Sequence, residues 1–175
     1  DTTVCQGTKV LLTSPIYEPA EYPGIEFVWT PGEGQLTPDS LYNMVAQPNL
    51  TTTYQRITRF GQCSDTSYAL VTVIPPAELT ATPVNPKICP GEQVQLNVTY
   101  DPGVTGISWM PATSLSCDSC DNPIASPQST TTYSVTGEFM GCPGSASVTV
   151  EVVPLPLYQF PGDRQLCGGE SVQLN

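Results

Sequence analysis

Apolar and polar residues alternate along short stretches of this chain, and turn-forming residues separate the stretches. In Glu92–Thr99 the side chains of Val94, Leu96 and Val98 fall on one face, which is the period of a half-buried β-strand. Further strands are expected at Leu79–Val84, Gly106–Met110, Ile124–Ser126, Thr131–Val135 and Ser147–Val153. The pattern predicts an all-β protein built from short strands.

A motif that occurs twice divides the chain into repeats. Asn43–Tyr54 and Asn122–Tyr133 share an Asn, an Ala, a Pro, three consecutive Thr and a Tyr at matching positions. An opening segment occurs three times, around Cys5, Cys89 and Cys167, at intervals of about 80 residues. We therefore expect repeat 1 at residues 1–76, repeat 2 at residues 77–155 and the start of a third repeat at residues 156–175. Because Asn175 lies inside an expected strand, we expect the chain to be an excerpt of a longer array.

The order of strands within a repeat predicts the fold class. Each repeat holds about seven short strands, with a Trp on the third and a Tyr at the start of the sixth, which is typical of a two-sheet, Ig-like sandwich. Trp29 and Trp109 are expected in the centre of the core. Tyr54 and Tyr133 are expected there too, each with its hydroxyl bonded back to the backbone. The whole is predicted to be a head-to-tail array of Ig-like (PKD-like) sandwiches.

Two local features refine this prediction. Arg56 stands where repeat 2 has Val135, and since burying an unpaired Arg is costly, we expect a bulge or an exposed strand there. Pro75-Pro76 and Pro154-Leu155-Pro156 join the repeats, and proline favours extended backbone, so these joints are expected to be stiff spacers.

The charge of the chain excludes some partners. Its net charge is −11, with five Lys plus Arg and no His. Nucleic acids and anionic membrane surfaces are bound by basic surfaces, so neither is an expected partner. No apolar run is long enough to cross a membrane as a helix.

The seven cysteines indicate an oxidising compartment, because they form no Cys/His cluster. Cys117 and Cys120 are close in sequence and are expected to form a local disulfide. A zinc site would need further ligands, and a redox pair would need a following helix.

The other cysteines leave two pairings open. Cys5–Cys63 and Cys89–Cys142 would lie within repeats. In a sandwich, however, the two cysteines of one repeat should lie at opposite ends, farther apart than the roughly 7 Å that a disulfide spans between Cα atoms. A staggered Cys5–Cys142 bridge between repeats would avoid this, with Cys63 linking backward and Cys89 and Cys167 linking forward.

The residues offer no catalytic site. Without His, and with its cysteines oxidised, the chain cannot form a Ser–His or Cys–His pair, so it is predicted not to be an enzyme and no cofactor is expected. Asp101, Asp118 and Asp121 lie in loops expected at one end of repeat 2 and form a weak calcium candidate. A solvated acidic loop is the competing interpretation.

Five motifs of repeat 2 occur in the order Cys-Pro-Gly-Glu-x-Val-x-Leu, Trp-x-Pro, Asn-Pro-x-Ala-x-Pro-x-x-Thr-Thr-Thr-Tyr, Gly-Cys and Val-Thr-Val-x-Val. Taken together, they are similar to the Ig-like/PKD-like repeats of large Bacteroidota surface proteins. These include gliding-motility-associated adhesins exported by type IX secretion. The resemblance implies a secreted or cell-surface array on a Gram-negative bacterium. It also makes Ser40, in Asp39-Ser40-Leu41, and Thr2 candidates for O-glycosylation, with an unmodified turn as the alternative.

The expected function is therefore mechanical: a stiff extracellular stalk or filament for surface adhesion or motility. Its partners would be the neighbouring repeats of the same chain, further copies in a filament, or a surface polysaccharide or protein. The alternative is a set of spacer or carbohydrate-binding domains attached to a secreted enzyme.

Overall fold

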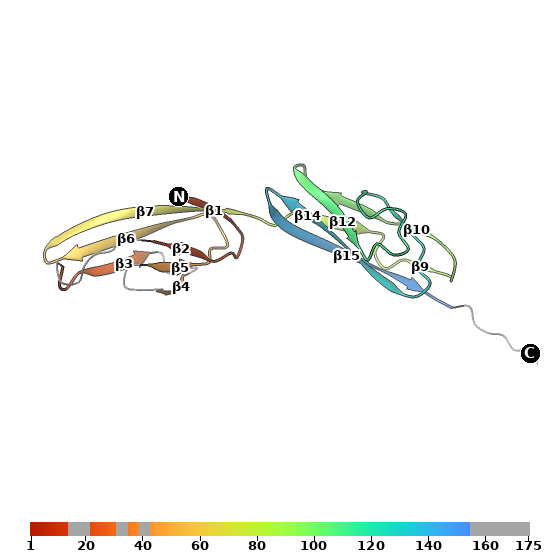
Figure 1. The fold of residues 1–175 in the computed structure, drawn as a ribbon, viewed down its shortest axis with the longest axis horizontal. Helices are drawn as coiled ribbons and strands as arrows, with labels where there is room; N and C mark the ends of the chain where they lie inside the picture. Colours follow the sequence, from red (N-terminus) through yellow and green to blue (C-terminus); the bar gives the residue numbers. More distant parts are fainter. Residues whose placement is uncertain (14–21, 31–34, 39–42, 155–175) are drawn as a thin grey trace, which may run out of the picture.

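The computed structural model describes residues 1–13, 22–30, 35–38 and 43–154, and within residues 35–38 it describes the backbone only. All regular elements in these ranges are strands, and they form two β-sandwiches that follow one another along the long axis (Figure 1). The prediction of an all-β array of tandem Ig-like sandwiches is confirmed.

Repeat 1 has two sheets. The first has the order β1-β7-β6-β3 and the second the order β2-β5-β4. Their strands are β1 (Thr2–Cys5), β2 (Val10–Leu12), β3 (Glu26–Thr30), β4 (Gln35–Pro38), β5 (Met44–Ala46), β6 (Thr52–Phe60) and β7 (Cys63–Ile74). All neighbours pair antiparallel except β1 and β7, which run parallel.

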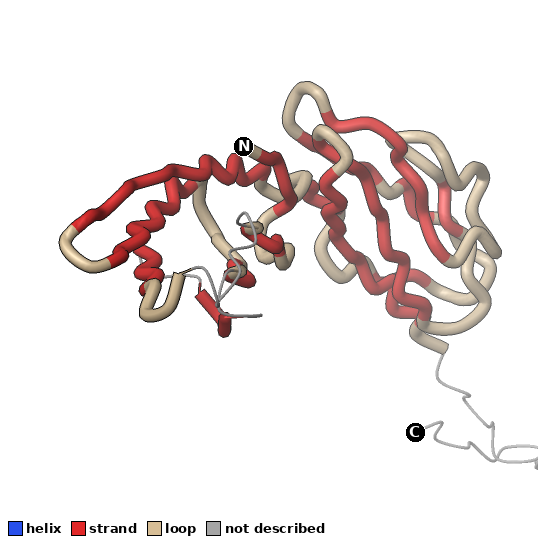
Figure 2. Tube along the Cα trace, turned by 60° about the vertical axis from the view of Figure 1, so that its left-hand side comes forward, coloured by secondary structure: helices blue, strands red, loops and turns tan. Residues whose placement is uncertain are grey.

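Repeat 2 repeats this plan. One sheet has the order β12-β14-β15-β9, and two further pairs, β11-β8 and β10-β13, face it across the core. The strands are β8 (Leu79–Thr82), β9 (Lys87–Ile88), β10 (Val94–Gln95), β11 (Asn97–Tyr100), β12 (Val104–Met110), β13 (Ile124–Ala125), β14 (Thr131–Phe139) and β15 (Cys142–Val152). β9 runs parallel to β15, as β1 does to β7. Figure 2 shows the two sandwiches from a second direction.

The duplicated motif supplies one wall of each core. Pro123, Ala125 and Pro127 are buried, while Ile124 between them is 42% exposed. The matching residues of repeat 1, Met44, Ala46 and Pro48, are buried as well. The spacing of the motif is therefore set by every second residue of a short strand facing the core.

The segment Glu92–Thr99 differs from its prediction as one strand. It forms two short strands, β10 and β11, with Leu96 between them. The N–H groups of Leu96 and Val98 donate to the carbonyls of Pro123 and Asp121, both at 2.8 Å, so the pairing with the segment that leads into β13 continues past Leu96 while β11 also pairs with β8. The expected inward face holds for Leu96 and Val98, which are buried. Alternation identifies the buried side chains, but it does not identify the strand that pairs with each half.

Three of the four predicted core aromatics are fully buried: Trp109, Tyr54 and Tyr133 are each 0% exposed. Trp29 differs, since it is only partly buried at the edge of the core of repeat 1. The predicted backbone bond of the Tyr133 hydroxyl is wrong, because among the described residues this buried oxygen has no hydrogen-bond partner. The residue belongs to the apolar core cluster of repeat 2.

The prediction for Arg56 is also wrong. The residue lies in the regular β6 ladder opposite Trp29 and is 7% exposed, with no bulge. Its guanidinium carbon lies 5.8 Å from the ring centroid of Phe27 and 5.9 Å from that of Trp29. Attraction to these ring faces stabilises the cation where water is excluded.

Replacing Tyr133 by Phe tests this packing. The substitution removes a buried hydroxyl that lacks a partner, so we expect the free energy of unfolding of repeat 2 to stay the same or rise by about 1 kcal/mol. Urea unfolding in a Trp29→Phe background, followed by the fluorescence of Trp109, measures it. A loss of more than about 1 kcal/mol would show that the hydroxyl is bonded after all.

Candidate functional site

The joint between the repeats is the site that the cysteines identify. On the side of repeat 1, β1 ends at Cys5, which lies opposite Ile74 at the end of β7. The N–H of Gln6 extends this pairing by donating to the carbonyl of Ile74 at 2.9 Å. A turn follows, in which the N–H of Thr8 donates to the carbonyl of Cys5 at 3.0 Å and Gly7 has a φ of 74°. A φ of this sign at the third residue is typical of a type II turn and favours Gly.

On the side of repeat 2, the hairpin between β14 and β15 presents the second cysteine. Phe139 pairs with Cys142 across a loop of Met140 and Gly141, whose φ values are 51° and 82°. Positive φ at both loop residues is the conformation that twists two antiparallel strands into a tight hairpin. Cys142 is 2% exposed, although it lies at the end of its domain, because repeat 1 covers it.

A disulfide joins Cys5 to Cys142 across the joint, with their Cα atoms 5.4 Å apart. This is the staggered pairing of the two that the sequence left open. The alternative within repeat 1 does not fit, because Cys5 lies opposite Ile74 while Cys63 starts the same strand, about 36 Å away at the usual rise per residue. A disulfide needs Cα atoms within roughly 7 Å.

The same geometry separates Cys89 from Cys142. Cys89 follows β9, whose Ile88 pairs with Val152 at the far end of β15, whereas Cys142 begins that strand. Among the described cysteines, Cys63 and Cys89 are free. Cys167 lies outside the described residues.

The linker between the repeats packs against the same hairpin. Pro75 and Pro76 are exposed, but Ala77 is 6% exposed and contacts Gly144, two residues after Cys142. A Cβ at Gly144 would overlap the backbone carbonyl of Ala77. The sequence prediction did not include this contact. One difference between the repeats could have indicated it: repeat 2 has a glycine, Gly144, at the position where repeat 1 has Asp65. A glycine allows another backbone to come close.

These contacts determine what the joint can do. A single linker would let one sandwich rotate about it, whereas here the disulfide makes a second covalent connection and Ala77 a packed contact beside it. The two sandwiches are therefore joined at two points, the linker and the disulfide, and the Ala77–Gly144 contact packs the end of the linker against repeat 2.

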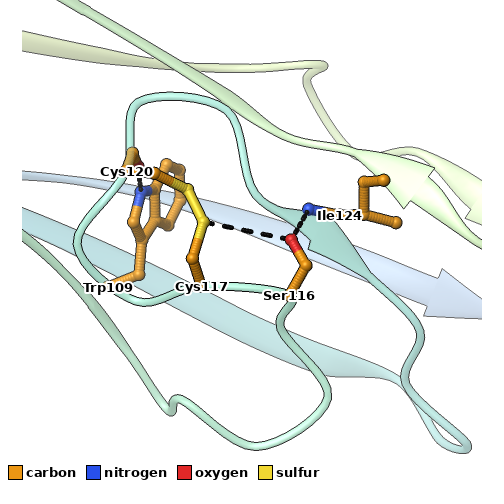
Figure 3. Close-up of a disulfide and its surroundings, with 5 residues drawn as sticks. All are labelled: Trp109, Ser116, Cys117, Cys120 and Ile124. Atoms are coloured by element: carbon orange, nitrogen blue, oxygen red, sulfur yellow. Dashed lines mark hydrogen bonds between the residues drawn. A yellow bond between two sulfur atoms is a disulfide. The ribbon is translucent and has the colours of Figure 1, made fainter.

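The second disulfide closes a loop over the core of repeat 2. Cys117 and Cys120 have their Cα atoms 6.0 Å apart, in the pairing expected from their spacing. The carbonyl of Cys120 accepts a hydrogen bond of 3.0 Å from the indole Nε1 of Trp109, as Figure 3 shows. The backbone N–H of Trp109 donates to the carbonyl of Asp118 at 2.7 Å, and the N–H of Ile124 donates to Ser116 Oγ at 2.9 Å. The loop thus supplies a hydrogen-bond acceptor for the indole N–H of Trp109, the largest of the fully buried side chains described.

The structure shows a side-chain contact for one of the three predicted calcium ligands, Asp121, and backbone contacts for the other two. Asp121 Oδ1 accepts a hydrogen bond of 3.0 Å from the Tyr100 hydroxyl, and this bond raises the pKa of Tyr100. The carbonyls of Asp101 and Asp118 accept backbone hydrogen bonds. Within the described part of the chain, no three Asp, Glu, Cys or His side chains gather in a way that would hold a metal ion. The calcium candidate gains no support from this geometry.

The two glycosylation candidates remain predictions. Thr2 is exposed at the start of β1, in a strand and not in a loop. Ser40 lies outside the described residues. In the described ranges there is also no helix with the length and apolarity of a membrane span.

No model of a known protein family matches the chain, and no curated protein matches its sequence. Solved structures of tandem domains are similar to it. They include titin domains Z1Z2 in complex with telethonin (16% identity, TM-score 0.38, covering 87% of this chain and 91% of that one). A second is the structure of immunoglobulin domains 1–4 of Sidekick-1, with 13% identity and a TM-score of 0.41, covering 87% of this chain and 46% of that one. A third is the structure of extracellular domains 3–5 of Drosophila OTK, with 13% identity and a TM-score of 0.40, covering 95% of this chain and 66% of that one. At these low scores the likenesses carry no further conclusion.

Removing the local disulfide with Cys117→Ser and Cys120→Ser together should destabilise repeat 2. Closing so short a loop contributes about 2 kcal/mol in the chain-entropy account of disulfides. The midpoint of urea unfolding should fall accordingly, while the Cys5–Cys142 bond still forms. An unchanged midpoint would mean that the hydrogen bonds to Trp109 hold the loop without the disulfide.

Gly144→Ala tests the packed contact of the linker. The added Cβ would displace Ala77 and move Cys142 away from Cys5, so we expect the rate of Cys5–Cys142 oxidation in a glutathione buffer to fall about tenfold or more. Peptide mapping without reduction measures it. Ser145→Ala, at the adjacent exposed position, is the matched control and should oxidise normally. Equal rates in both variants would show that the contact does not position the cysteines.

Proposed function

We propose that the chain is a non-catalytic, extracellular structural protein whose repeats form a stiff stalk or filament for surface adhesion or motility. The observation that carries this proposal is the Cys5–Cys142 bridge across the joint. A disulfide between repeats does little for the core of either sandwich. It fixes the orientation of one sandwich relative to the next, which is the property that an extended rod needs.

Redox chemistry and charge support an extracellular setting. Disulfides persist in oxidising compartments, and this chain forms two of them among its described residues. With a net charge of −11, neighbouring rods would repel one another at low ionic strength and remain dispersed. The absence of His from the sequence and the hydrogen bond that Asp121 accepts from Tyr100 agree with a protein without catalysis.

The cellular setting rests on the sequence motifs. Their similarity to repeats of Bacteroidota surface proteins supports the surface of a Gram-negative bacterium and export by type IX secretion. In such an array the repeats set the distance between the cell and whatever the distal part binds, a surface polysaccharide or a protein. The described residues would act as this spacer, and recognition would lie elsewhere in the array.

Small-angle X-ray scattering tests the rod directly. We expect the oxidised chain to give one extended maximum dimension, and the double variant Cys5→Ser, Cys142→Ser to give a broader distribution with a shorter mean, because only the linker then joins the sandwiches. The matched control is Cys117→Ser with Cys120→Ser, which removes a disulfide away from the joint. If the joint variant scatters like the wild type, the disulfide does not stiffen the array and the proposal fails.

A further inference from the structure

Each repeat has two different ends, and the observed joint shows how they fit. One end, here called the donor end, presents a cysteine in a turn after the parallel edge strand. The other, the acceptor end, presents a cysteine at the start of a returning hairpin strand. In the observed joint the donor end of repeat 1 (β1 and the turn Cys5–Thr8) meets the acceptor end of repeat 2 (the hairpin Phe139–Cys142).

The donor end of repeat 2 has the same construction as that of repeat 1. β9 runs parallel to the end of β15, and the N–H of Val153 donates to the carbonyl of Ile88 at 2.9 Å. The turn that follows has the N–H of Glu92 donating to the carbonyl of Cys89 at 3.1 Å, with Gly91 at a φ of 88°. Cys89 therefore lies where Cys5 lies, in the same turn on the same kind of strand.

The acceptor end of repeat 1 likewise matches that of repeat 2. Phe60 pairs with Cys63 across a two-residue loop, as Phe139 pairs with Cys142. Each repeat also has a turn that contains a glycine of positive φ, Gly24 in repeat 1 and Gly103 in repeat 2. In repeat 1 the N–H of Ile25 donates to the carbonyl of Tyr22, and in repeat 2 the N–H of Val104 donates to the carbonyl of Asp101, both at 3.3 Å.

The surface around Cys63 is open and largely apolar. Tyr22, Ile25, Phe60 and Cys63 contribute to a shallow depression, and the Tyr22 and Phe60 rings meet edge to face at 5.7 Å. Cys63 is exposed, whereas Cys142 is buried under repeat 1. The difference between these two equivalent residues is the neighbouring repeat that covers one of them.

We propose that Cys63 and its depression form an acceptor site for the donor end of another repeat of this kind, and that Cys89 is the matching donor. Two copies of this chain would then join end to end through a Cys89–Cys63 disulfide. The two thiols lose two protons and two electrons, which a small disulfide such as oxidised glutathione takes up to become two thiols. The inference rests on the proposed function. It adds that the copies in a rod all point the same way, because each joint pairs a donor end with an acceptor end.

One position departs from the observed joint. Asp65 stands where Gly144 makes room for the linker, so a linker cannot approach the acceptor site of repeat 1 as closely as Ala77 approaches Gly144. The disulfide itself needs only the approach of the two cysteines, which Asp65 does not block by lying two residues after Cys63.

The test uses two variants of the full chain, both carrying Cys167→Ser so that no third thiol reacts. Cys89→Ser leaves only the acceptor thiol, and Cys63→Ser leaves only the donor thiol. One variant is labelled with nitrogen-15, so that mass spectrometry tells mixed dimers from like dimers. Both must first show an intact Cys5–Cys142 bond by peptide mapping, which establishes that they are folded.

In a glutathione redox buffer we expect the mixture to give mixed dimers in about tenfold excess over like dimers, because docking of the two ends raises the effective concentration of their thiols. The bridging peptide should contain Cys63 and Cys89. The Cys167→Ser protein that keeps both Cys63 and Cys89 should form disulfide-linked chains of more than two copies. Equal yields of like and mixed dimers, or no dimers at all, would overturn the inference. Either result leaves the scattering test of the single chain unaffected, so the two proposals can fail separately.

Discussion

The parallel pairing of an edge strand with the last strand of each repeat, β1 with β7 and β9 with β15, is the constraint on which the joint depends. Because β1 and β7 run in the same direction, Cys5 reaches the end of the sandwich where the chain leaves for the next repeat. The hairpin cysteine of that repeat lies at the end where the chain enters. An antiparallel pairing over the same residues would place Cys5 beside Val71, away from the end of the sandwich where the chain leaves. The direction of this edge strand therefore decides whether Cys5 lies at the joint.

Much of this arrangement could be predicted from the sequence, because it follows from periodicities. The spacing of Pro123, Ala125 and Pro127 and its counterpart in repeat 1 reflects a two-residue strand period, and the opposite placement of the cysteines follows from strand length. The sandwich was predicted from such reasoning, and so was the staggered pairing as one of two that remained open.

The remaining features depend on contacts between distant residues, for which a single sequence carries no periodic signal. The second pairing of Asn97–Tyr100, with β8, involves residues that lie well before it in the sequence, and Arg56 is buried beside two rings of the neighbouring strand β3. The close approach of Ala77 is visible in the sequence only as a glycine at position 144, and glycine has many other uses.

The joint also determines how a pulling force would enter repeat 1. With the linker alone, tension would reach the sandwich only through β7 and would shear it past β1. The disulfide ties the end of β1 to the same neighbouring hairpin, so both strands of the parallel pair are held at one point and move together. Under the proposed mechanical function, tension would then be shared between two adjacent strands, and the bridge that sets the orientation of the joint would also support the edge of the sheet where the load arrives.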